Sequence, residues 1–201
     1  MEKSANTRYP ITDLIRNRWS PLAFSEQRIE PEKLLQLFEA ARWAPSSYNE
    51  QPWSFIVARK EDREEHERLL GCLVEGNIAW ARHAPVLILS VARLQFQHNQ
   101  DPNRHALHDV GLATENLVLQ AEALGLHAHL MAGFSADKAR KVYQIPTEFE
   151  PVAVMAVGYL GDVKNLSEPL RKREEAERVR KPLSEMLFSG KWGQTSTIIS
   201  N

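Results

Sequence analysis

The stretch Ala44–Trp53, "APSSYNEQPW", joins two regular elements with an unusually varied set of side chains. It follows Glu32–Trp43, in which apolar residues recur at three- and four-residue spacings, the pattern of an amphipathic helix. It precedes the short, β-prone segment "SFIVA". Such a connection needs only a few Gly, Asp or Ser residues. This one carries two serines, an asparagine, a glutamine, a tyrosine and two prolines, which by themselves form an ordinary Ser/Asn turn.

Composition bounds the class of protein. The chain has 201 residues, enough for one domain with a sizeable core, and its 43% hydrophobic and 25% charged residues are typical of soluble globular proteins. A formal net charge of −1 provides no overall field for nucleic acid or a membrane surface. The single cysteine, Cys72, cannot form an intrachain disulfide and suits a reducing compartment. No signal peptide and no apolar run near the roughly 20 residues of a membrane helix is seen, so we expect a cytoplasmic protein.

Helical and strand patterns alternate along the chain. They predict helices over 10–17, 31–43, 62–73, 103–124 and 136–145, and strands over 53–58, 84–92, 126–131 and 151–160. The helix over 103–124 is apolar nearly all round, which predicts burial in a core or a subunit interface.

The segment from about residue 162 to 201 is rich in charge and has too little apolar surface to form a domain. We expect an arm that wraps over another surface, and its arginines either form a solvated face or supply an anion site.

Other chemistry has weaker support. His105, His108 and Asp109 lie within one helical turn, a spacing that zinc sites can use, but two histidines and a carboxylate fall at such spacings often by chance. No metal is therefore predicted. The chain has no G-x-S-x-G, no Walker-type phosphate loop and no G-x-G-x-x-G, which leaves a serine hydrolase and a conventional dinucleotide fold unsupported.

Six segments occur in an order that resembles the nitroreductase family of FMN-dependent oxidoreductases. They are "RNRWSPLAF", "APSSYNEQPWSFIV", "EGNIAWARHAPVLI", "DVGLATENLVLQAEALGLHAHLMAGF", "IPTEFEPVAVMAVGYLGD" and "RVRKPLSE". The resemblance implies an α+β fold with a central mixed β-sheet flanked by helices. It also implies an intertwined homodimer with two FMN molecules in the interface. The whole chain, 1–201, is then one domain whose arm, about 162–201, wraps the partner subunit.

The resemblance assigns the phosphate of FMN to arginines from both ends of the chain. Arg18 and Ser20 match the N-terminal phosphate and ribityl site, and Arg178 and Arg180 match the cations that family members bring from near the C-terminus. Bidentate guanidinium groups suit a phosphate dianion. Trp19 stands where the family commonly has a polar residue, so its backbone is the part expected to contact the flavin edge.

The flavin ring is assigned to three further segments. By resemblance, the loop around Ala44–Trp53 reaches the flavin bound chiefly by the other subunit, through Pro45, Ser46, Ser47, Asn49 and Gln51. Asn77 matches an asparagine that hydrogen-bonds the pyrimidine edge, and the turn Met131, Ala132 and Gly133 matches the backbone beside flavin N5. No side-chain acid or base is expected for the transfer itself, because the cofactor carries the chemistry.

Departures from the family limit what can be carried over. Many members have a lysine where this chain has Leu22, one of the cofactor-binding positions, and another where it has Trp80, and those cations help hold negative charge on the reduced ring. Ala132 stands where the best-studied type has glutamate. These changes concern redox potential and substrate range.

The function expected from the resemblance is an NAD(P)H oxidoreductase. It takes hydride from NADH or NADPH and passes it by a ping-pong route to a nitroaromatic, a quinone or a related conjugated acceptor. The alternative is a flavin-binding protein with little turnover that serves storage or sensing; a metal hydrolase comes third.

Overall fold

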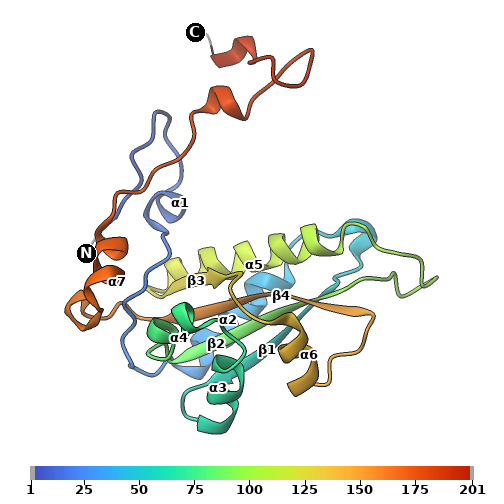
Figure 1. Cartoon of the computed structure of the whole chain (residues 1–201). Helices are drawn as coiled ribbons and strands as arrows, with labels where there is room; N and C mark the ends of the chain where they lie inside the picture. Colours follow the sequence, from blue (N-terminus) through green and yellow to red (C-terminus); the bar gives the residue numbers. More distant parts are fainter. Residues whose placement is uncertain (1–2, 200–201) are drawn as a thin grey trace.

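The structure, a computed structural model, describes residues 3–199 and is built around one four-stranded sheet (Figure 1). The strands are β1 Trp53–Arg59, β2 Val86–Arg93, β3 His127–Met131 and β4 Phe149–Gly158, in the order β1-β2-β4-β3. The α-helices are α1 Asp13–Asn17, α2 Pro31–Arg42, α3 Arg63–Leu70, α4 Glu75–Ala81, α5 Ala106–Ala123, α6 Ala136–Val142 and α7 Glu168–Glu175. Short 3-10 turns lie at Ser47–Asn49, Val163–Asn165, Leu183–Glu185 and Thr197–Ile199.

Each expected helix and strand is present, with ends that differ by a few residues. The helix expected from residue 103 begins at Ala106, because the Asn103 side chain instead accepts the backbone N–H of His105 at 3.0 Å and forms a turn. Helix α4 was not predicted. Its seven residues are too few to display a clear apolar period, and its N-cap position is Val74, which cannot cap with its side chain.

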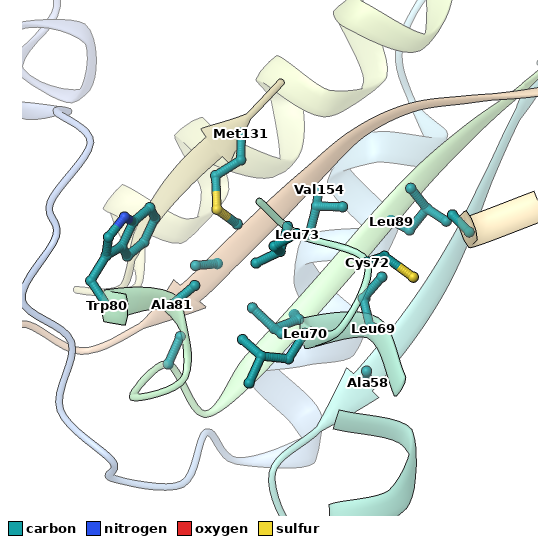
Figure 2. Close-up of a cluster of buried hydrophobic side chains, with 14 of the residues drawn as sticks. Ala58, Leu69, Leu70, Cys72, Leu73, Trp80, Ala81, Leu89, Met131 and Val154 are labelled. Atoms are coloured by element: carbon teal, nitrogen blue, oxygen red, sulfur yellow. The ribbon is translucent and has the colours of Figure 1, made fainter. Parts of the chain in front are cut away.

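Both faces of the sheet are covered by helices. Leu87, Leu89 and Val91 of β2 pack with α3, α4 and α6, whereas the alternate residues Val86 and Ile88 pack with α2 and α5. Successive side chains of a strand point to opposite faces, so a strand buried on both sides must be apolar throughout. Figure 2 shows the first of these clusters, in which side chains from α3 and α4 meet those of the sheet. The predicted α+β fold is confirmed.

The sheet is antiparallel in each of its three pairings, which corrects the expectation of a mixed sheet. Strands β2 and β3 are joined through the long helix α5 and run in the same direction. However, β4 lies between them and runs opposite to both. The helical crossover therefore produces no parallel pair within the described chain.

The N-terminal segment and the C-terminal arm leave the body of the molecule together (Figure 1). Hydrogen bonds join them: Lys3 Nζ donates to the Ala176 oxygen at 2.6 Å, and Arg178 donates to the Arg16 oxygen at 2.9 Å. Both segments expose large apolar side chains, the most exposed being Trp192 at 94%. Over residues 3–199, no helix is long and apolar enough to cross a membrane.

Candidate functional site

The two arginines of the arm meet the N-terminal arginine in one pocket. Arg18, Arg178 and Arg180 line a hollow of about 250 Å³ together with Lys3 and Arg173. The other expected residues of this group, Trp19, Ser20 and Leu22, line the same pocket. Residues 160 positions apart in the chain thus converge because the arm runs back along the N-terminal segment.

A buried carboxylate attaches the arm to the segment that carries Arg18. Glu174 of α7, only 3% exposed, accepts the backbone N–H of Leu22 at 2.7 Å and that of Ala23 at 3.4 Å. A carboxylate that accepts backbone N–H groups in a buried setting forms strong, charge-assisted hydrogen bonds. Glu174 therefore attaches α7 to the backbone at Leu22 and Ala23, beside the pocket.

We expect Glu174→Ala to destabilise the attachment of the arm by about 1.5–3 kcal/mol, because it leaves two N–H groups without their charged acceptor. Limited proteolysis should then cut the chain near α7 faster, and urea unfolding should begin at a lower concentration. Glu175→Ala is the matched control, because Glu175 is exposed. Equal proteolysis rates in the two variants would contradict this role.

Cations outnumber carboxylates in the arginine pocket, where Lys3 and four arginines face Glu174 and Glu177 among the described residues. Among residues 3–199, no carboxylate lies within ion-pair distance of Arg18, Arg178 or Arg180. Burial lowers the pKa of Arg178, and the neighbouring Arg18 and Arg180 lower that pKa further. Mutual repulsion of this kind is relieved by an anion that binds all three groups. The pocket is therefore suited to a phosphate or another compact anion.

A second group of expected residues lies where β3 ends and α6 begins. Asn77 of α4 donates from Nδ2 to the Gly133 oxygen at 3.0 Å, which joins the asparagine to the turn of Met131, Ala132 and Gly133. A Cβ atom at position 133 would lie 2.6 Å from Asn77 Nδ2, so only glycine leaves room for the Asn77 side chain beside the turn. Asn77 Oδ1 has no hydrogen-bond partner within the described chain and is free for a ligand.

The loop from Pro45 to Gln51 is held in an uncommon conformation. Tyr48, Asn49 and Gln51 all have positive φ, at 53°, 54° and 51°. Ser46 Oγ accepts the N–H of Gln51 at 3.0 Å and so closes the loop on itself. Left-handed non-glycine residues cost energy and persist only where the surrounding contacts hold them, which is common in ligand-binding segments.

The loop lies far from the arginine pocket of its own chain. Ser47 N–H donates to Asp109 Oδ2 at 2.9 Å, at the first turn of α5. Arg18 and Arg178 instead act on the pKa of Glu122, at the last turn of the same helix. These two acidic residues are 13 positions apart, or about 20 Å along an α-helix. Within one chain the expected residues therefore form three separate groups.

One of the two histidines considered for zinc has a contact of another kind. His108 Nδ1 lies 2.9 Å from Asp109 Oδ1, and the other oxygen of Asp109 accepts from the Ser47 backbone. No group of three or more His, Cys, Asp or Glu side chains in residues 3–199 is arranged to hold a metal ion. Asp109 has a structural role in fixing the loop.

The two positions at which the family resemblance led us to expect lysine are part of the apolar core. Leu22 is 3% exposed and Trp80 is fully buried, with its ring stacked on Phe24 at a centroid distance of 6.1 Å. Neither position supplies a cation. Beside them, His129 of β3 lines the arginine pocket, a residue that the sequence patterns had not assigned to the site. Lys3, Arg173 and Glu174 were likewise missed, because a charged terminus and a charged helix have no local signature of a shared pocket.

Together these features define a class of protein: an α+β fold with an arginine-lined pocket near one end of β3 and a glycine turn at the other. The Nitroreductase family model matches residues 15–159, and the chain belongs to this family.

Individual relatives agree with this assignment. A 15.4 kDa protein of Mycolicibacterium smegmatis is 34% identical over 146 residues, which cover 69% of this chain and 97% of the relative. A protein of Archaeoglobus fulgidus, provisionally named as an NADH dehydrogenase/NAD(P)H nitroreductase, is 28% identical and covers 77% of this chain and 88% of its own length. Among solved structures, one described as an oxidoreductase containing FMN superposes with a TM-score of 0.87 at 36% identity. It covers 94% of this chain and 96% of its own.

Proposed function

We propose that this protein is an FMN-dependent NAD(P)H oxidoreductase. It takes hydride from NADH or NADPH and passes it to a nitroaromatic, a quinone or a related conjugated acceptor. Family membership and the similarity to an FMN-containing oxidoreductase support the cofactor. The observation in the molecule that carries the proposal is the cluster of Arg18, Arg178 and Arg180, three guanidinium groups in one pocket with no carboxylate partner among the described residues.

In this proposal one group of residues binds the phosphate end of FMN and a second group binds its ring. Arg18, Arg178 and Arg180 bind the phosphate, with Ser20 at 3.4 Å from the Arg18 guanidinium as a further hydroxyl partner. Trp19, whose ring lies 6.4 Å from that of His127 at the start of β3, closes one side. The turn of Met131, Ala132 and Gly133 stands at the other end of that strand, with Asn77 beside it. Strand β3 thus spans the distance between a phosphate site and a ring site, as an elongated ligand requires.

Bound FMN supplies the atom that accepts hydride, and the protein supplies position and charge. The backbone of Ala132 and Gly133 is available at the ring, and Asn77 Oδ1 is available as an acceptor for an N–H of the ring's polar edge. The loop residues Pro45, Ser46, Ser47, Asn49 and Gln51 cover the ring and limit the access of water. Hydride donor and acceptor use this space in turn, which is the ping-pong route.

The functional unit that we propose is a homodimer. The loop is tied to Asp109, about 20 Å along α5 from the arginine pocket of its own chain, so it serves the pocket of the partner. The exposed apolar side chains of the projecting segments favour the same arrangement, because a large contiguous apolar surface on a soluble protein generally marks an interface. They are Tyr9, Ile11, Leu14 and Ile15 near the N-terminus and Val179, Met186, Leu187, Trp192 and Ile198 in the arm. The chain is then one domain whose arm, about 162–201, wraps the partner subunit.

A flavin-binding protein with little turnover is the second candidate. The apolar, buried side chains of Leu22 and Trp80 favour it, because they leave the ring without the lysines that relatives use. Storage or sensing would require the arginine pocket but not efficient reduction of the ring.

We expect the purified protein to be yellow, or to become yellow with FMN, and to lose its visible flavin absorption when NADH or NADPH is added without oxygen. A quinone or a nitroaromatic compound should then restore the colour. A protein that dithionite bleaches but neither nicotinamide reduces would support the low-turnover candidate. A protein that takes up no FMN on reconstitution would refute both.

A further inference from the structure

Among the described residues, His129 alone places an imidazole in the lining of the arginine pocket, and its tautomer is determined by its surroundings. Its Nδ1 lies 2.8 Å from the backbone oxygen of Pro21, which can only accept a hydrogen bond. Nδ1 therefore carries the proton, and in the neutral ring Nε2 holds a lone pair. No residue of the described chain hydrogen-bonds Nε2. The imidazole ring packs against Trp80 at a centroid distance of 4.5 Å, which holds its orientation.

The surroundings of this histidine favour its neutral form. Burial is the largest cause that lowers the pKa of His129; the hydrogen bond to Pro21 opposes it, and the charges of Arg173 and Arg18 lower the pKa further by smaller amounts. The other charged groups that line the pocket come from the N-terminal segment and the arm: Lys3, Glu174, Glu177, Arg178 and Arg180. Glu174 is already engaged by two backbone N–H groups. Cations therefore dominate around the imidazole.

His129 also lies between the two ends proposed for the ligand. It is the middle residue of β3, which leads into the turn of Met131, Ala132 and Gly133, and it packs on Trp80, about one helical turn after Asn77 in α4. The five cations of the pocket are charged whether or not a ligand is present. The imidazole is the side chain there that can change from neutral to positive near pH 7 when negative charge appears beside it.

We propose that His129 takes up a proton at Nε2 when the flavin bound in this pocket is reduced, and so balances the negative charge of the reduced ring. The proposal rests on the proposed function. The side chains of Leu22 and Trp80 carry no charge and cannot balance the negative charge of the reduced ring; the proposal gives that role to the imidazole of His129.

The proton and electron balance is as follows. The nicotinamide gives a hydride, which is two electrons and one proton, and becomes positively charged. The flavin gains that hydride and one negative charge. The second proton comes from solvent and binds Nε2 of His129, and it leaves when the flavin is reoxidised. No oxidant or reductant beyond the nicotinamide and the acceptor is needed.

The pH dependence of the midpoint potential of bound FMN tests this uptake. Each proton taken up in a two-electron reduction changes the potential by about 30 mV per pH unit. We expect about 59 mV per pH unit for the wild-type holoprotein near neutral pH, because two protons are taken up. His129→Asn places its amide nitrogen where Nδ1 lies and so retains a donor for the Pro21 oxygen, but it cannot be protonated, so its slope should fall to about 30 mV per pH unit.

His66→Gln is the matched control. His66 is also buried and also hydrogen-bonded to a backbone oxygen, that of Ala84 at 3.0 Å, but it does not line the arginine pocket. Its variant should keep the wild-type slope. A slope of about 59 mV per pH unit in both wild type and His129→Asn would mean that the flavin itself takes the second proton. A slope of about 30 mV per pH unit in both proteins would mean that no second proton is taken up on reduction. Either result overturns the proposal.

Nitrogen NMR of the wild-type holoprotein, labelled at histidine, gives a second readout that needs no variant. At pH 7 the Nε2 signal of His129 should be that of an unprotonated nitrogen with oxidised FMN and that of a protonated nitrogen after reduction, while His66 does not change. Protonation on FMN binding without further change on reduction would show a response to the phosphate alone, and would overturn the proposal. Failure to bind FMN at all would instead refute the proposed function.

Discussion

Replacement of Arg18 by alanine is expected to weaken FMN binding about 10- to 150-fold, because it removes a charge-assisted contact to the phosphate worth about 1.5–3 kcal/mol. Arg180→Ala should act in the same direction. Because Arg18 and Arg180 both lower the pKa of Arg178 by repulsion, removing either should leave the FMN-free protein as stable as before or slightly more stable. A loss of affinity without a loss of stability is the result that separates a binding residue from a structural one.

Riboflavin, which lacks the phosphate, supplies the complementary measurement. The parent protein should bind it far more weakly than FMN, and in Arg18→Ala the difference between the two ligands should shrink. Fluorescence quenching of the flavin measures both affinities. Arg16→Ala is the control, because Arg16 lies two residues earlier and forms an exposed ion pair with Asp13 at 2.7 Å. Equal affinities of the parent protein for FMN and riboflavin would contradict the assignment of the pocket.

The second large effect is expected in mixed dimers. If the loop of one chain covers the flavin held by Arg18 of the other, an Arg18→Ala chain and a Ser47→Trp chain should complement one another. Each homodimer carries a defect in every site and should be nearly inactive. A mixed dimer has one site with both defects and one site with neither, so its activity should be near half that of the wild-type dimer.

Subunit exchange must be verified before activity is measured, for example by purifying the mixed dimer with two different affinity tags. A mixed dimer of Arg18→Ala with Arg180→Ala is the control. Those two residues line the same pocket of one chain, so both sites of that dimer stay defective and no recovery is expected. Absence of recovery in the first mixture as well would mean that loop and pocket serve the same flavin within one chain.

Local patterns predicted most of the secondary structure. Strand β2 was found because a strand covered on both faces must be apolar throughout, and α2 because its apolar residues share one helical face. Helix α4 was missed because seven residues cannot display a period. The resemblance of ordered segments indicated Arg18, Arg178 and Arg180, which the structure brings into one pocket. Asn77 and Gly133 were likewise indicated, and they are hydrogen-bonded to each other.

The sequence alone determined the family and, apart from α4, the helices and strands, since these depend on patterns among residues within a few positions of one another. Only the tertiary structure decided the order of the strands, because β4 inserts between β2 and β3 by pairing with segments far away in the chain. It also decided the contact of Glu174 with Leu22 across 152 residues, and the lowered pKa of His129, which follows from burial and from the nearby charges of Arg173 and Arg18. Such contacts have no local signature, because burial and electric field are properties of the assembled molecule and not of neighbouring residues in the sequence.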